Sequence, residues 1–128
     1  MLIYQSKYDE MLTSYETIAP DDLYPRAMGF AAIAYYHTGQ QDEVDEIITV
    51  LTGQSNDSPI GSPAYHLAII YAQMGEADLA FDWLDKAHRD RKIEMYWLKV
   101  EPPLKPLHSD PRWNEMLFKV RFVADVKG

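Results

Sequence analysis

The sequence predicts an all-α fold made of stacked helical hairpins. Apolar side chains recur with helical spacing on both sides of Gly75, over residues 62–87. Ser62 and Pro63 are typical of the first residues of a helix, and Gly75 is suited to end one because glycine tolerates a positive φ. Residues 24–52 show the same pattern 36 positions earlier in the chain. We therefore expect an α-α superhelix with a helical cap at its C-terminal end.

The pattern divides a single domain, residues 1–128, into four parts. They are a half repeat (1–18), whose helix we expect over residues 7–18, a first hairpin (24–52), a second hairpin (62–91) and a C-terminal cap (93–122). The lone first helix either belongs to a longer parent protein or acts as a cap, because a repeat helix needs a partner to bury its apolar face.

The C-terminal cap begins in an irregular part of the chain. A short helix is expected over residues 93–100, and the three prolines of residues 101–107 (EPPLKPL) predict an extended segment. Asp110 and Pro111 then start a last helix that ends at Phe122. Five apolar residues of this region are expected to cover the second hairpin: Trp97, Leu104, Leu107, Trp113 and Leu117.

The two hairpins match residue by residue. Ala32, Tyr35 and Gly39 fall on Ala68, Tyr71 and Gly75, and in the second helices Val44, Ile48 and Leu51 fall on Ala80, Leu84 and Ala87. This pattern resembles the tetratricopeptide repeat (TPR) family, whose unit is a helix–turn–helix of about 34 residues. The resemblance covers residues 7–91, although Met28 and Ala64 stand where the family has a large aromatic residue and the closing prolines are out of register.

The residues before and within the last helix show a second resemblance. Residues 106–113 (PLHSDPRW) are similar to the closing segment of TPR domains attached to bacterial nucleotide cyclases and winged-helix transcription regulators. The resemblance covers some 15 residues. It implies a capped C-terminal end and, as an alternative function, a regulatory domain of a larger signalling protein.

Composition excludes several functional classes. The chain has no cysteine, which removes disulfides and thiolate chemistry, and no apolar stretch that approaches 18 residues, so we expect no membrane span. A net charge of −8 argues against nucleic-acid binding, which depends on contacts to phosphate. No signal peptide is recognised, and we expect a cytoplasmic protein.

Charge is divided unevenly along the chain. Residues 1–85 carry a net charge of −12, whereas residues 86–128 carry +4. The simpler interpretation is a solvated acidic surface with a basic tail. The alternative is that the basic end meets an acidic face, either in the same chain or in a neighbouring molecule.

No enzyme, metal site or cofactor site is expected. The four histidines lie at positions 37, 66, 88 and 108, without the spacing of a metal-binding motif. His108, Ser109 and Asp110 are the residue types of a catalytic triad, but a triad is assembled in space and not by adjacency. The aromatic residues lie at helical spacing, which favours packing in a core or cap.

A concave face is the expected functional surface, because the first helices of stacked repeats line such a face. By resemblance to the family, its groove would be formed by side chains that suit an apolar or mixed peptide: Arg26, Ile33, Tyr36, His37, Tyr65, Ile69 and Gln73. An acidic chaperone tail is not expected, because these positions offer one Arg and no Lys or Asn. Alternatively, these residues pack against a neighbouring repeat or against the chain's own C-terminal segment.

These observations together favour a non-catalytic module that binds a protein or peptide of unknown identity. We also expect self-association into a two-fold homodimer, since closed symmetry dominates among oligomers. The expected interface contains the first helix, whose apolar residues Met11, Tyr15 and Ile18 have no predicted partner helix.

Overall fold

The computed structural model describes residues 2–17, 25–54, 62–90, 92, 95, 98 and 101–127. The side chains of residues 2–7 and 121–127 lie outside the description. Every regular element within these ranges is helical, and none of the described residues forms a strand. The predicted all-α class is therefore confirmed.

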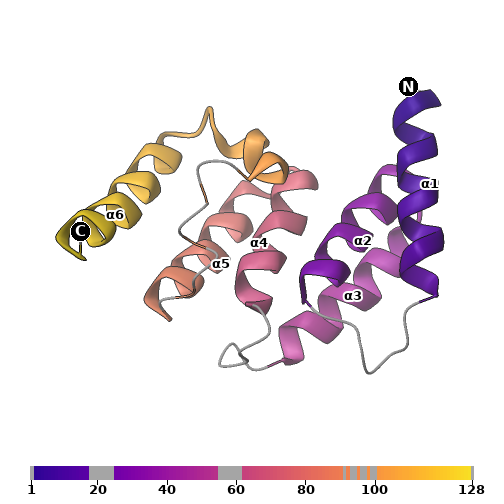
Figure 1. Ribbon diagram of the computed structural model, residues 1–128, viewed down its shortest axis with the longest axis horizontal. Helices are drawn as coiled ribbons and strands as arrows, with labels where there is room; N and C mark the ends of the chain where they lie inside the picture. The colour runs from indigo at the N-terminus through magenta and orange to yellow at the C-terminus, as the bar shows by residue number, and fades with distance from the viewer. Residues whose placement is uncertain are drawn as a thin grey trace.

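Six α-helices and the 3-10 helix η3 are the longer elements of the described ranges, in which Met95 and Leu98 also have 3-10 conformation. Their bounds are α1 Leu2–Glu16, α2 Pro25–His37, α3 Gln41–Gly53, α4 Pro63–Gln73, α5 Ala77–Arg89, η3 Pro102–Leu107 and α6 Pro111–Lys127. The helices lie side by side in one array, with α1 and α6 at opposite ends (Figure 1). Helices α2 and α3 form the first hairpin, helices α4 and α5 form the second, and η3 packs on α4.

The two hairpins turn in the same way, as the repeat in the sequence predicts. Gly39 and Gly75 adopt φ values of 80° and 79°, in the left-handed region that glycine enters without steric cost. After each glycine, a backbone N–H reaches back five residues: from Gln40 to the Tyr35 carbonyl at 2.8 Å and from Glu76 to the Tyr71 carbonyl at 2.9 Å. These bonds satisfy helix-terminal carbonyl groups, and they show that the 36-residue period is structural.

Two helix starts follow directly from the sequence. The Ser62 hydroxyl accepts a hydrogen bond from the Tyr65 backbone N–H at 3.1 Å, with Pro63 at the first turn of α4. At the start of α6, the Asp110 carboxylate accepts a bond from the Arg112 backbone N–H at 2.9 Å. The same carboxylate also pairs with the Arg112 side chain at 2.9 Å. Both N-caps were predicted, and both are confirmed.

The contribution of the α6 N-cap to stability is expected to depend on pH, because its Asp110 side chain ionises. Hydrogen bonds from Arg112 lower the pKa of Asp110 from 3.8 to about 2. A carboxylate with a lowered pKa stabilises the fold above its ordinary pKa, and this contribution is lost as the pH falls from about 4 towards 2. Asp110→Asn keeps the capping ability but not the charge. We therefore expect the wild type to melt above Asp110→Asn at pH 6 and the gap to close by pH 2, as followed by circular dichroism. A gap that does not change with pH would contradict this expectation.

The core extends along the array in two apolar clusters. One joins α2, α3 and Leu12 of α1, and the other joins α4, α5, η3 and α6. Helix α4 lies between them, and nine of its eleven residues are buried. A helix that is apolar on all sides is stable only when other elements surround it. Helix α4 therefore forms the centre of the molecule.

Helices α2 and α4 approach closely at Gly29. A Cβ atom built on Gly29 would lie 3.2 Å from the Cβ of His66, so a larger residue there would require the histidine to move by a few tenths of an ångström. The ring of His66 is buried, and its Nδ1 donates a hydrogen bond to the Ser62 carbonyl at 2.8 Å. The close approach of Gly29 and His66 sets the spacing of α2 and α4 at this point.

Three predicted elements differ from the structure. Residues 102–107 form a 3-10 helix and are not extended, because proline fixes φ at a value that suits both conformations. Helix α1 begins at Leu2, earlier than predicted, since no helix-breaking residue lies between Leu2 and Lys7. Helix α6 continues to Lys127 for the same reason. The predicted helix 93–100 falls mostly outside the described residues, as do Ile18 and Trp97.

Candidate functional site

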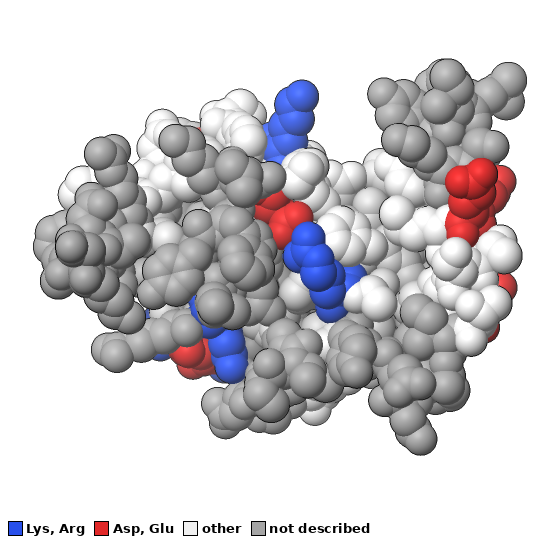
Figure 2. All heavy atoms as spheres, viewed as in Figure 1, with Lys and Arg blue, Asp and Glu red and all other residues white. Residues whose placement is uncertain are grey.

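A hollow of about 450 Å³ opens between helices α1, α2 and α4 and the start of η3. We call it the groove hollow. Apolar side chains of α1 and α2 line much of it, and Glu101 with the first two residues of η3 forms another wall. In the view of Figure 2, basic and acidic side chains meet near the middle of the molecule, beside uncharged described side chains. The lining residues are Tyr8, Met11, Arg26, Phe30, Ile33, Gln73, Glu101, Pro102 and Pro103.

A buried carboxylate stands at one edge of the groove hollow. The side chain of Glu101 is only 3% exposed, and its two oxygens accept hydrogen bonds from the Arg26 guanidinium at 3.3 and 3.4 Å. The Tyr65 hydroxyl donates a third bond at 3.0 Å. Arg26 is half exposed and lies over the ring of Phe30, 4.8 Å from its centroid. The pair thus presents a guanidinium to the hollow and keeps the carboxylate inside.

A second polar chain crosses the same face. The Nε2 of His37 lies 2.8 Å from the Oε1 of Gln73, and the Nε2 of Gln73 donates to the Pro103 carbonyl at 2.8 Å. The Tyr8 ring stacks on His37, with centroids 5.2 Å apart and an interplanar angle of 15°. Side chains of α1, α2 and α4 are therefore linked to the start of η3.

The structure separates the seven predicted groove residues into two groups. Arg26 and His37 are exposed, and Tyr36 and Gln73 are half-buried. Ile33, Tyr65 and Ile69 are buried, with exposed fractions of 6%, 0% and 1%. These three side chains therefore offer little surface to a partner, and of the three only Ile33 lines the groove hollow.

The buried residues are covered by the chain's own C-terminal segment, by which we mean residues 101–120. Leu104, Leu107 and Trp113 of this segment are buried in one apolar cluster with Tyr65 and Ile69. Leu117 packs against the same cluster. The burial of Tyr65 and Ile69 agrees with the alternative interpretation of the groove positions, in which they pack against the chain's own C-terminal segment.

Several residues of the groove hollow escaped the sequence analysis. Tyr8 and Met11 were assigned to a helix without a predicted partner, and Glu101, Pro102 and Pro103 were assigned to the extended segment of the C-terminal cap. One feature of the sequence did indicate that the groove residues of α4 are covered. The run PAYHLAIIYA in α4 is apolar on every side, which indicates burial on the face that was expected to be open.

Helix α1 is less exposed than the prediction of a dimer interface assumed. Leu12 is buried in the first cluster, and Tyr15 packs edge-on against Tyr35, with centroids 6.4 Å apart. The Tyr35 hydroxyl donates a hydrogen bond to Glu16 at 3.2 Å. Burial and the nearby Glu16 carboxylate raise the pKa of Tyr35 to about 12. The exposed described residues of α1 are mainly polar, with Met11 as the apolar one. Self-association stays a prediction, but fewer apolar side chains support it.

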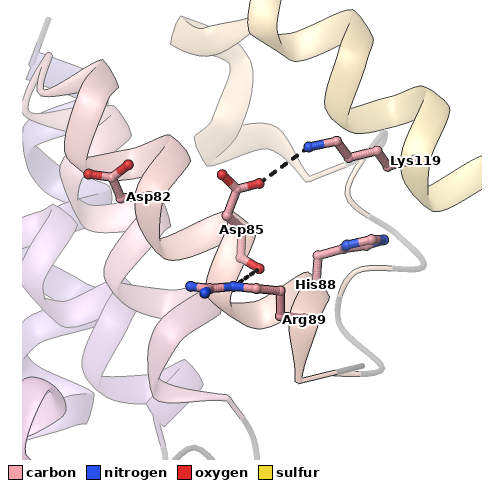
Figure 3. Close-up of a pocket in the computed structure, with 5 residues that line it drawn as sticks. All are labelled: Asp82, Asp85, His88, Arg89 and Lys119. Carbon is pink, nitrogen blue, oxygen red and sulfur yellow. Dashed lines mark hydrogen bonds and ion pairs between the residues drawn. The ribbon is translucent and has the colours of Figure 1, made fainter.

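A second hollow, of about 600 Å³, lies between α5 and α6 and is lined by charged side chains (Figure 3). Lys119 of α6 reaches Asp85 of α5 at 3.7 Å, and the Arg89 Nε donates to the Asp85 carbonyl at 3.4 Å. Asp82 and His88 complete the lining. Charges of both signs alternate here, so the hollow favours no ligand charge.

No three His, Asp or Glu residues within the described ranges come close enough together to hold a metal ion. None of the helices, over the part that the structure describes, is both long and apolar enough to cross a membrane.

Comparison with known proteins gives no match to a family model, a curated protein or a solved structure.

Proposed function

We propose that the chain is a non-catalytic interaction module of TPR type that binds a protein or peptide segment at the groove hollow. The observation that carries this proposal is an open, largely apolar hollow on the face lined by the first helices of two repeated hairpins. The equivalent turns at Gly39 and Gly75 support the repeat assignment. The hollow takes in only part of the groove expected from the sequence, because the C-terminal segment covers Tyr65 and Ile69 of α4.

The lining favours a partner that inserts an apolar side chain. Tyr8, Phe30 and Met11 offer aromatic and thioether surface, and Pro102 and Pro103 add rigid apolar walls. Aromatic residues provide large contact areas at low cost in conformational entropy, and methionine adapts to irregular shapes. A volume of about 450 Å³ is in the range of ligand-binding pockets, and it suits a short anchor better than a long helix.

Peptide display against the purified protein tests this proposal. Peptides selected on the wild type should share an apolar or aromatic anchor and should lose affinity at least about tenfold on Met11→Glu, since a charge would enter an apolar contact. Met11 is 39% exposed, so the substitution should preserve the fold. Affinities are measured by titration calorimetry.

Val50→Glu is the matched control, because Val50 is 44% exposed on α3 and does not line the groove hollow. It should bind the selected peptides as the wild type does. Failure to select any peptide, or equal binding by Met11→Glu and the wild type, would reject the groove hollow as the binding site.

A further inference from the structure

We propose that Arg26 and Glu101 form a latch through which the groove hollow controls docking of the C-terminal segment. This inference rests on the proposed function, because it adds regulation to the same hollow. The latch is the pair of hydrogen bonds, 3.3 and 3.4 Å long, between the guanidinium of α2 and the carboxylate that precedes η3.

The burial of Glu101 makes docking of the C-terminal segment depend on its pairing with Arg26. Its side chain is 3% exposed, so its charge is almost removed from water. A buried carboxylate is tolerated when cations or hydrogen-bond donors compensate it, and loss of the partner leaves it uncompensated. Arg26 and the Tyr65 hydroxyl bind its oxygens, and of these two only Arg26 is charged. Docking of the segment therefore depends on Arg26.

The position of Arg26 connects this dependence to the groove hollow. Its side chain is 50% exposed and lines the hollow, whereas Tyr65 is fully buried behind it. An occupant that draws the guanidinium towards itself removes the positive charge from Glu101. An occupant that leaves the pair intact packs over a closed latch. Occupancy and docking then influence each other reciprocally, as linked equilibria must.

A second bond at the same edge extends the coupling. Gln73 lines the hollow, binds His37 through its Oε1 and holds the Pro103 carbonyl through its Nε2. Just beyond Pro103, Leu104 and Leu107 are buried in the core cluster that also contains Trp113 of α6. Release of residues 101–103 therefore exposes apolar side chains of the segment and loosens α6.

Hydrogen exchange followed by mass spectrometry tests the latch in the purified protein without any partner. Arg26→Ala should speed exchange of amides in residues 101–113 by about tenfold or more, because the buried carboxylate loses its cation. Residues 41–53 of α3 should exchange as in the wild type. Lys105→Ala removes an exposed cation of η3 outside the latch and is the matched control, with no expected change.

The double variant gives the sharper comparison. Glu101→Gln keeps acceptor and donor atoms but removes the charge, so Arg26→Ala with Glu101→Gln should exchange more slowly than Arg26→Ala alone. If Arg26→Ala does not fold, Arg26→Lys should show a smaller increase, of roughly threefold, because lysine retains the charge without the two-pronged geometry. Exchange equal to that of Lys105→Ala, or a double variant no slower than the single one, would overturn the latch.

The link to occupancy has its own measurement. A display-selected peptide that Met11→Glu no longer binds should, at saturation, change exchange of residues 101–113 at least about threefold in the wild type. In Arg26→Ala the same peptide should change the exchange of these residues much less. Unchanged exchange in the wild type would overturn the link while leaving the proposed function intact. Absence of peptide binding would instead reject the proposed function.

Discussion

Tyr65→Ala is expected to lower the free energy of unfolding by about 3–5 kcal/mol, as is usual for removing a large aromatic side chain from a core. Tyr65 is fully buried and packs with Ile69, Leu104 and Leu107 in the second apolar cluster. Its removal leaves a cavity at the centre of the molecule and takes a hydrogen bond from the buried Glu101 carboxylate. Urea unfolding followed by circular dichroism measures the loss.

Two further tyrosine variants separate the contribution of the Tyr65 hydroxyl from that of its buried ring. Tyr65→Phe removes only the hydroxyl, so its expected cost is about 1.5–3 kcal/mol, the range for a hydrogen bond to a charged group. Tyr36→Ala changes the other tyrosine of the predicted groove, which is half-buried, and should cost less than Tyr65→Ala. Equal losses for Tyr36→Ala and Tyr65→Ala would contradict the burial described here.

Trp113→Ala is expected to cost about 3–5 kcal/mol and to release α6 from the array. Trp113 is 4% exposed, belongs to the second apolar cluster and contacts the His108 ring, with centroids 4.5 Å apart. The ion pair between Arg112 and Asp78, at 2.8 Å, lies at the surface and adds little once the tryptophan is removed. Thermal unfolding and hydrogen exchange of residues 111–120 measure the two effects.

Phe118→Ala provides a control on the same helix. Phe118 is 69% exposed, so replacing it should change stability by no more than about 0.5 kcal/mol. If Trp113→Ala proved as mild as Phe118→Ala, the packing of Trp113 in the apolar cluster would not hold α6 against the array.

The elements that were predicted correctly are those with local causes. Ser62 and Pro63 start a helix, and Gly39 and Gly75 end two, because capping and positive φ depend on a few neighbouring atoms. The conformation of residues 102–107 was not predictable in this way. Proline restricts φ but leaves ψ to the tertiary contacts. In the 3-10 helix, Leu104 and Leu107 lie three residues apart on one side and are both buried.

Prediction of the site was limited by long-range contacts. The repeat pattern places Arg26, His37 and Gln73 on one face correctly, because helical spacing decides which side chains share a face. It does not encode which chain segment covers that face. The burial of Tyr65 and Ile69 and the pairing of Arg26 with Glu101 depend on a segment far away in the sequence. Periodicity within one hairpin contains no information about that segment.

Burial of the second hairpin under the C-terminal segment also restricts how such an array evolves. Tandem duplication lengthens a repeat protein only where the new unit finds an apolar surface to join. After α5, that surface is already covered by Leu104, Leu107, Trp113 and Met116. A hairpin inserted directly after α5 would compete with residues 101–120 for the same contacts. Duplication of the second hairpin therefore requires residues 101–120 to be duplicated with it, which makes the two one heritable unit.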